Sequence, residues 1–273
     1  MKNLIGNSGC NLELFEDKRI VRKSAPSLQY GRRLLKQANK QQYFFNYLKS
    51  NALPIEVPEV LNIGSNHFDM KFIAGQTAPE FFTNTNIENS NILLKKILQF
   101  IEFNINNCNK NMDFKTKLLK KLYSIHDSTN EPIIQDLIKK INLLTSFELP
   151  VGPCHGDLTL SNMIITNSKQ IYFIDFLDSF IQSPVIDIVK IRQDTFHLWQ
   201  FYNRYGTQNL DKIKYCTMMK YLDTLVCNNR IVQCYFGKYN ILQAVNLCRI
   251  LPYTDDEIVK KYLKQEIKDL IEQ

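Results

Sequence analysis

The 273-residue sequence has few of the features that mark secreted, membrane or metal-cluster proteins. Its seven cysteines are scattered, and no Cys-x-x-Cys pair occurs, which argues against a disulfide framework or a zinc site. The four histidines lie far apart, so no metal cluster is predicted. No apolar run approaches the ~18 residues of a membrane helix, and residues 1–10 lack the apolar segment of a signal peptide. We therefore expect a cytoplasmic protein that does not associate with membranes.

Nucleic-acid binding is also not expected, although the formal net charge is +7. The lysines are spread as pairs along expected helices, with no clustered arm and no recognition motif. A basic balance does favour phosphorylated ligands. The length and the 44% hydrophobic content fit one large domain or two lobes with a substantial core. The sequence makes no prediction of oligomeric state.

The densest signal is the stretch 154–166, continued by 171–176. Met163 to Thr166 and Ile171 to Phe176 are apolar and β-branched, and the polar residues 167–170 between them predict a β-hairpin. A hairpin places the residue before its first strand near the end of its second strand. We therefore expect Asn162 and Asp175 to be neighbours, with Asp157 on the loop that leads into the hairpin.

These three polar side chains suit a metal-nucleotide site. Mg²⁺ takes hard oxygen ligands, commonly one or two from the protein and the rest from phosphates and water. Asp175 and Asn162 would supply such oxygens, and Asp157 could accept a proton from an attacking hydroxyl. The alternative interpretation is a buried polar loop that caps the hairpin.

The pattern His-Gly-Asp-x-x-x-x-Asn at 155–162, followed by Ile-Asp-Phe at 174–176, resembles the aminoglycoside phosphotransferase and choline kinase family. These enzymes are small-molecule relatives of the protein kinases, whose loop reads His-Arg-Asp-x-x-x-x-Asn. Gly156 in place of arginine resembles the small-molecule branch. The resemblance implies a two-lobed α+β protein kinase-like fold. It places a β-rich nucleotide-binding lobe at 1–74 and a mostly helical catalytic and acceptor-binding lobe at 75–273.

Residues 5–23 are predicted to form a small β-meander with a glycine-containing turn. The resemblance assigns this turn to covering the nucleotide phosphates, through Gly6, Asn7, Ser8 and Gly9. It also places a phosphate-binding lysine on the following strand. We prefer Lys23, with Arg22 as the rival, because alternation puts the two side chains on opposite faces. The ordinary alternatives are a hairpin turn and an exposed cation.

A long helix is predicted over residues 28–50 from apolar and small residues at helical spacing. In the family this helix supplies an acidic partner for the strand lysine. This chain departs from that pattern, because no Asp or Glu occurs between Asp17 and Glu56. Gln41, or Gln37 one turn earlier, could hydrogen-bond the lysine instead.

Two strands are predicted at 57–63 and 68–73, and the second resembles the segment that joins the lobes. In the family adenine pairs with backbone groups of this hinge, which here would be the Lys71 carbonyl and the Ile73 amide. The alternative is a plain edge strand.

The rest of the chain is predicted to be largely helical, with helices at 91–105, 113–126 and 132–145 and Asn-rich loops at 84–91 and 104–111. The segment after Asp175 reaches a helix start at Pro184 within a few residues, which leaves little room for the peptide-docking segment of a protein kinase. His155 and Asp187 are interpreted as structural supports of the catalytic loop. Asp194 and Trp199 are weak candidates for contacts with the acceptor.

We therefore expect an enzyme that moves the γ-phosphate of ATP, or GTP, to a hydroxyl of a small molecule such as a sugar, an amino alcohol or an aminoglycoside. Asp157 would be the catalytic base, Asn162 and Asp175 would hold Mg²⁺, and Lys23 would contact the phosphates. Two alternatives remain open: a non-catalytic kinase-like nucleotide-binding module and, less favoured, a protein kinase.

Overall fold

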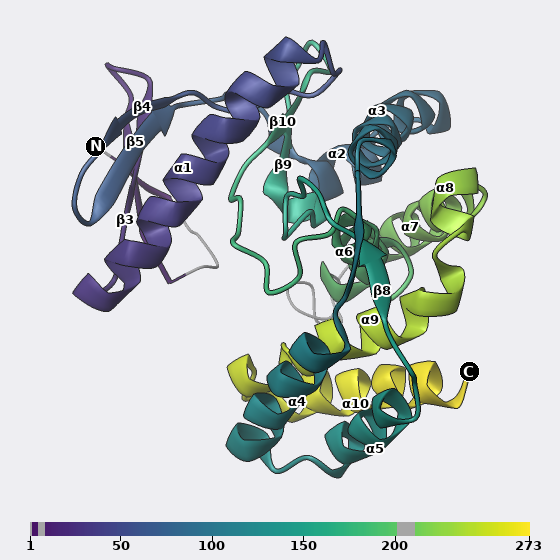
Figure 1. The fold of residues 1–273 in the computed structure, drawn as a ribbon. Helices are drawn as coiled ribbons and strands as arrows, with labels where there is room; N and C mark the ends of the chain where they lie inside the picture. Colours follow the sequence, from purple (N-terminus) through teal and green to yellow (C-terminus); the bar gives the residue numbers. More distant parts are fainter. Residues whose placement is uncertain (1, 5–8, 201–210) are drawn as a thin grey trace. The chain divides into compact units, whose positions relative to one another are not determined.

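The computed structural model describes residues 2–4, 9–200 and 211–273 (Figure 1). The chain forms two compact units. One contains Met1–Phe100 and His155–Ser179, and the other contains Ile101–Cys154 and Phe180–Gln273. The catalytic stretch predicted from the sequence thus belongs to the same compact unit as the N-terminal residues. The predicted lobe boundary between residues 74 and 75 stays a prediction.

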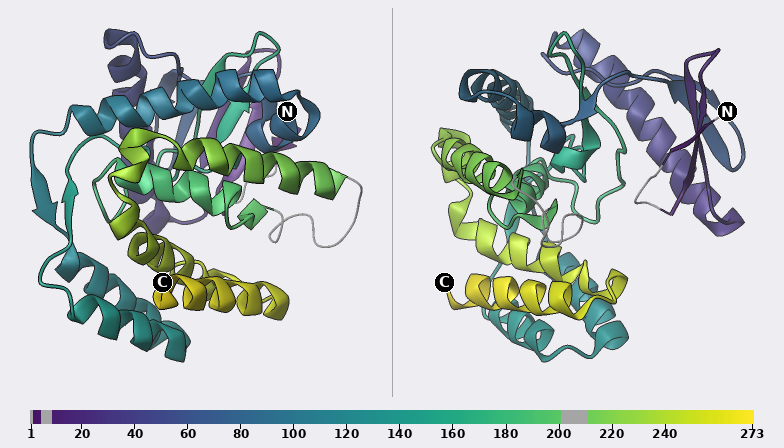
Figure 2. Two further views of the ribbon diagram at one scale, coloured as in Figure 1. Left: turned by 90° about the vertical axis from the view of Figure 1, so that its right-hand side faces the viewer. Right: turned by 180° about the vertical axis from the view of Figure 1, so that it is seen from behind.

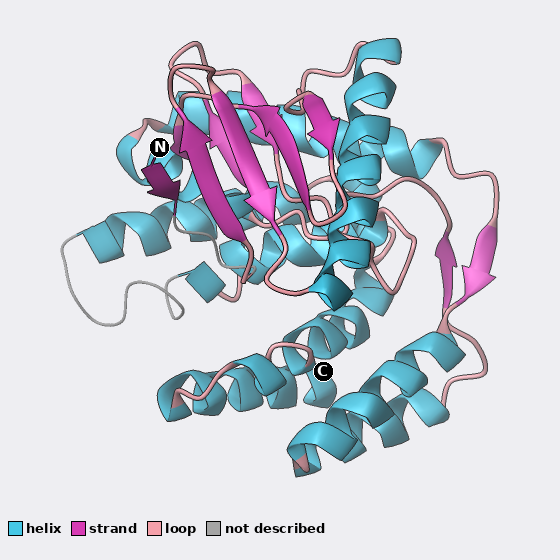
Figure 3. Cartoon of the chain, turned by 90° about the vertical axis from the view of Figure 1, so that its left-hand side faces the viewer, coloured by secondary structure: helices cyan, strands magenta, loops and turns pink. Residues whose placement is uncertain are grey.

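An antiparallel sheet, whose strands are magenta in Figure 3, dominates the first unit. Its strand order is β1-β2-β3-β5-β4. Its strands are β1 (Lys2–Leu4), β2 (Asn11–Phe15), β3 (Ile20–Ser24), β4 (Val60–Ile63) and β5 (His67–Lys71). The tight turn between β2 and β3 closes with Arg19 in the left-handed region, at φ 53°. Within the described residues, the β-meander predicted from the sequence is therefore present.

One long helix, α1 (Leu28–Ser50), packs on this sheet (Figure 1). It begins at Ser27, whose side-chain oxygen accepts a hydrogen bond from the Tyr30 amide, as is common at helix N-termini. Leu34 and Ala38, four residues apart on one face, form a buried cluster with Cys10 and with Phe68 of β5. The helix therefore covers the face of the sheet on which Phe68 lies.

A second, smaller sheet in the same unit contains the predicted hairpin. Strands β9 (Met163–Ile165) and β10 (Ile171–Phe173) pair antiparallel, and β6 (Gln76–Thr77) pairs with the other edge of β9. The short helix η1 (Leu160–Asn162) precedes β9, and α2 (Ala78–Asn84) follows β6. The hairpin and the turn at 167–170 are confirmed.

The second unit is mostly helical. Helices α9 (Phe236–Cys248) and α10 (Glu257–Glu272) pack along each other, and α4 (Lys115–Thr129) and α10 both contact α5 (Pro132–Asn142) (Figure 2). The elements are β7 (Asn111–Asp113), α4 (Lys115–Thr129), α5 (Pro132–Asn142), β8 (Glu148–Pro150), α6 (Val185–Thr195), α7 (Asp211–Cys227), α8 (Arg230–Gln233), α9 (Phe236–Cys248), η3 (Leu251–Tyr253) and α10 (Glu257–Glu272). The predicted α+β class, with a small antiparallel sheet followed by a mostly helical remainder, is confirmed.

The prediction of Asn-rich loops was partly wrong. Helix α3 (Ile87–Asn106) takes in residues from both predicted loops. The Asn86 side chain accepts a hydrogen bond from the Asn89 amide at 2.9 Å, which satisfies a free N–H group of the first turn. Asparagine here begins a helix where a loop was expected. Among the described helices, none is both long enough and apolar enough to cross a membrane.

Candidate active site

The hairpin brings the three predicted polar residues together at one end. Strand pairing sets Met163 opposite Phe173, and the Ile174 amide donates to the Asn162 carbonyl at 3.0 Å. Asp175 follows directly. The Asn162 amide nitrogen donates to the backbone carbonyl of Asp157 at 2.8 Å and to its carboxylate at 3.2 Å. The Asn162 side chain therefore bonds to Asp157, and Asp175 directly follows the residue that bonds to the Asn162 carbonyl, so the three residues are neighbours as the spacing predicted.

Two residues of this network have a left-handed backbone. Gly156 has φ +89°, and a Cβ atom there would lie only 2.5 Å from the Leu177 carbonyl oxygen, so glycine is required on both counts. Asp175 has φ 60°, a conformation that aspartate tolerates better than most side chains. At these two turns the chain changes direction, and the loop and the end of the hairpin are hydrogen-bonded to each other.

His155 is fully buried and holds the loop together. Its Nε2 lies 2.9 Å from the Ile174 carbonyl, and its Nδ1 accepts from the Asp157 amide at 3.2 Å. A carbonyl can only accept and an amide can only donate, so the ring is the neutral tautomer with its proton on Nε2. Burial, reinforced by the charge of Lys40, lowers the pKa of His155 to about 3. The predicted part of His155 in fixing the loop backbone is confirmed.

The structure distinguishes the two cations of β3. Lys23 is buried, and its ammonium donates to Asp175 Oδ1 at 2.6 Å. Arg22 points to the other face, where its guanidinium makes a bidentate pair with Asp69 at 2.7 and 2.9 Å. Only Lys23 lies at the end of the hairpin. Its contact with nucleotide phosphates stays a prediction.

The expected hydrogen bond from Gln41 to this lysine was not found. The Gln41 amide nitrogen instead donates to the Pro58 carbonyl at 2.8 Å. The reason is its position on α1, which directs the side chain to the chain segment entering β4. Gln37, one turn earlier, is also buried, and neither of its side-chain polar atoms has a hydrogen-bond partner among the described residues.

The other predicted nucleotide contacts are only partly described. Gly6, Asn7 and Ser8 lie outside the described residues, and Gly9 has φ +70°, in keeping with a turn. Strand β5 ends at Lys71, whose amide donates to Glu59, and Phe72 makes the last bond to the sheet at Arg19. Ile73 lies just beyond the ladder. The adenine contacts of Lys71 and Ile73 stay predictions.

The donor set of the site fits Mg²⁺. Asp175 offers a carboxylate whose side chain is 27% exposed. Because the nitrogen of the Asn162 amide is engaged by Asp157, its oxygen is the end available to a cation. Two hard oxygens are few for a site built by protein alone, but they suit Mg²⁺ that also binds phosphates and water. No group of three or more His, Cys, Asp or Glu side chains suited to a metal occurs among the described residues.

Sequence reasoning missed Lys40. Its ammonium, on α1, donates to the Leu177 carbonyl at 2.5 Å. The two residues are 137 positions apart in the chain, so no local pattern could have paired them. From the sequence alone, a lysine on a helix is expected to be exposed to solvent.

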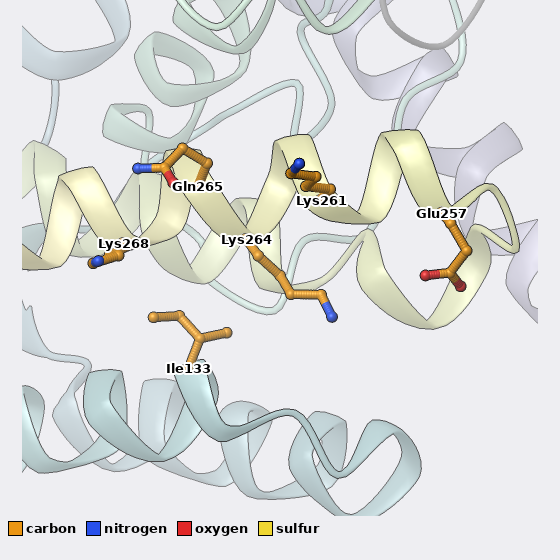
Figure 4. A pocket seen from close by; sticks show the side chains of 6 residues that line it. All are labelled: Ile133, Glu257, Lys261, Lys264, Gln265 and Lys268. Atoms are coloured by element: carbon orange, nitrogen blue, oxygen red, sulfur yellow. The ribbon is translucent and has the colours of Figure 1, made fainter.

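The two acceptor candidates, Asp194 and Trp199, belong to the second unit, as does Asp187, the predicted support of the catalytic loop. Asp187 and Asp194 are fully buried on α6, and Trp199 is half-buried. Their roles stay predictions. A pocket of about 310 Å³ also lies in this unit, between α5 and α10 (Figure 4). None of the predicted site residues lines it, and one of its cations, Lys264, pairs with Glu131 at 2.9 Å.

Residues 115–209 match the phosphotransferase enzyme family. This segment includes Asp157, Asn162 and Asp175, and the resemblance seen in the sequence is confirmed. No curated protein sequence matches the chain significantly.

Solved structures are similar over the whole chain. Aminoglycoside phosphotransferase APH(2″)-Ib bound to ADP is 16% identical with a TM-score of 0.60, covering 99% of this chain and 93% of that chain. The GDP complex of an aminoglycoside 2′-phosphotransferase-IIIa variant is 14% identical with a TM-score of 0.63, covering 99% and 90%. Choline kinase LicA from Streptococcus pneumoniae is 14% identical with a TM-score of 0.57, covering 100% and 93%. These likenesses confirm the two-lobed kinase-like α+β fold.

Proposed function

We propose that this chain transfers the γ-phosphate of ATP, or of GTP, to a hydroxyl group of a small molecule. The observation that carries the proposal is the linked set of Asp157, Asn162 and Asp175, with the buried ammonium of Lys23 against Asp175. The family match over 115–209 and the fold support it. A sugar, an amino alcohol and an aminoglycoside are all candidate acceptors.

In the proposed mechanism Asp157 orients the acceptor hydroxyl and takes its proton as the new oxygen–phosphorus bond forms. The bond from the γ-phosphorus to the bridging oxygen breaks, and the nucleoside diphosphate leaves with that oxygen. Asn162 keeps the carboxylate in place through its amide nitrogen. His155, which stays neutral, fixes the loop and carries no proton in the reaction.

Asn162 and Asp175 would hold Mg²⁺. When bound, the metal supplies neutralisation of the phosphate charge and fixes the phosphate orientation. Lys23 would bind the phosphates, which requires its ammonium to serve both Asp175 and the nucleotide. Positioning and charge neutralisation would account for most of the rate enhancement.

The test is phosphate transfer from isotopically labelled ATP with Mg²⁺ into a pool of small hydroxyl compounds, with products identified by mass spectrometry. Asp157→Asn, run beside the wild type, should lower kcat by roughly 10²–10⁴ while nucleotide still binds. A product made at the same rate by both proteins would contradict the mechanism. Bound nucleotide with no product from a broad pool would favour a non-catalytic binding module, and phosphate on polypeptides would favour a protein kinase.

A further inference from the structure

Helix α1 contacts the segment after Asp175 through two lysines one helical turn apart. Lys40 donates to the Leu177 carbonyl at 2.5 Å, and Lys36 pairs with Asp178 at 3.2 Å. Residues four apart lie on the same helix face, so both side chains extend toward this segment. The environments differ. Lys40 is half-buried, whereas the Lys36 side chain is 68% exposed and its partner 48%.

Lys40 also reaches the loop that carries Asp157. A Cβ atom on Gly156 would lie 3.2 Å from the Lys40 ammonium, so the missing side chain leaves the space this group occupies. The residue whose carbonyl accepts from Lys40 also donates its own N–H to the His155 carbonyl, at 3.2 Å. Leu177 thus bridges Lys40 and the loop. The lysine charge is felt there, since it contributes to the low pKa of His155.

The charges of helix α1 explain why a cation, Lys40, contacts the site. Helix α1 contains no acidic residue, and the buried Lys23 of β3 pairs with Asp175 rather than with a helix carboxylate. The helix therefore contacts this site through the ammonium of Lys40, which binds the segment that carries Asp175. The hydrogen bond from a half-buried ammonium to a carbonyl stabilises more than an exposed ion pair does, because a charge-assisted hydrogen bond becomes stronger when water is excluded.

We propose that Lys40 is a positioning residue for phosphate transfer, which ties the segment 175–178 to the loop 155–157 and so sets Asp175 relative to Asp157. This inference rests on the proposed function. Lys40 acts on the reaction only through these two segments. Displacements of about 1 Å in such groups can cost about 10²-fold in rate.

The test compares Lys40→Met, which keeps the apolar stem, with Lys40→Arg, which keeps the charge and a donor. Lys36→Met is the matched control one turn away on the same helix. We expect Lys40→Met to lower kcat by roughly 10- to 100-fold, with the KM for nucleotide changed by about 2-fold or less. Lys40→Arg should recover most of the loss, and Lys36→Met should stay within about 2-fold of wild type.

Amide hydrogen exchange gives a readout that does not depend on turnover. Peptides covering 174–180 should exchange roughly 10-fold faster in Lys40→Met, because the Leu177 N–H loses its support, and at the wild-type rate in Lys36→Met. Unchanged exchange and kcat in Lys40→Met would overturn the inference, as would an equal loss in Lys36→Met. If wild type transfers no phosphate, the proposed function fails, while the exchange data still decide whether Lys40 holds this segment. Lys40→Gln replaces Lys40→Met if the latter does not fold.

Discussion

Two ion pairs with buried cations, one in each compact unit, are built in different ways. In the second unit, Arg192 binds Asp223 through two bonds of 2.9 and 3.1 Å, and both side chains are at most 10% exposed. Thr195 and Cys227 donate to the same carboxylate, at 2.9 and 3.4 Å. The Arg192 guanidinium also lies over the Tyr239 ring, at 4.2 Å. Both carboxylate oxygens and two of the guanidinium nitrogens of this pair are thus engaged within the unit.

The pair in the first unit is open on one side. Lys23 is as buried as Arg192, with 5% of its side chain exposed, but Asp175 is 27% exposed and is contacted by the lysine through one oxygen. Asp175 also has a left-handed backbone. A closed pair mainly fixes structure, whereas an open carboxylate beside a buried cation is suited to bind something else. The comparison predicts that substitutions of Asp175 and Asp223 have different effects, the first mainly on turnover and the second mainly on stability.

The largest effect is expected for Asp175→Asn. The amide keeps an oxygen for Lys23 but removes the charge that Mg²⁺ requires, so kcat should fall by about 10³-fold, equivalent to several kcal/mol. The free energy of unfolding should change by only about 1 kcal/mol, since the carboxylate is partly solvated. Steady-state kinetics and urea denaturation measure the two quantities. Retained turnover with a loss of 3 kcal/mol or more in stability would make this pair structural, like the other (a threshold set by buried-pair values, about 3–5 kcal/mol).

Asp223→Ala should show the opposite pattern. It leaves the Arg192 charge buried without its partner, which typically costs about 3–5 kcal/mol in the free energy of unfolding. Asp178→Ala is the control, because its pair with Lys36 is exposed and worth about 0–1 kcal/mol. Urea denaturation of both variants measures the difference. Equal losses would mean that burial does not distinguish these pairs.

The buried His155 should make the stability of the protein depend on pH. An unfolded histidine takes up its proton near pH 6.5, whereas folded His155 does so only at about pH 3. Between these values the unfolded state binds more protons. The free energy of unfolding should therefore fall as pH is lowered, by up to about 1.4 kcal/mol per pH unit, with no such contribution above pH 6.5.

The His155→Gln variant isolates this contribution. Glutamine can still donate to Ile174 and accept from Asp157, but it does not titrate. Urea denaturation between pH 6.5 and 4 should therefore show a shallower slope in this variant than in wild type. Identical slopes in wild type and His155→Gln would mean that folding does not lower the pKa of His155.

The sequence predicted the site well where its residues are close in the chain. Asp157, Asn162 and Asp175 lie within one loop and hairpin, so residue spacing alone brought them together. The choice of Lys23 over Arg22 needed the alternation of β3, and the pairing with Asp175 spans 152 residues. The sequence alone did not predict this pairing, which depends on how the sheet folds.

The failures share a physical cause. The predicted role of Gln41 assumed that a polar residue on the inner face of α1 would reach the nearest charge, but a backbone carbonyl at Pro58 satisfies it instead. Lys40 was missed because its partner is a backbone carbonyl far along the chain. Such contacts depend on the carbonyls that the fold leaves unpaired, and residue types do not encode them.

The smallest effect is expected for Arg22, the neighbour of Lys23 on the other face of β3. Its pair with Asp69 is partly exposed, so Arg22→Met should cost only about 0–1 kcal/mol of stability. Nucleotide affinity should stay within about 2-fold, whereas Lys23→Met should weaken it by roughly 10-fold or more, the value of a charged hydrogen bond. Calorimetric titration with ATP and Mg²⁺ measures both. Because Arg22 also lowers the pKa of Asp69, losing it should reduce stability mainly above pH 4, where that carboxylate is ionised. If Arg22→Met weakened nucleotide binding as much as Lys23→Met, the rival cation would be the phosphate ligand, and the face of β3 bearing Lys23 would not be the nucleotide side.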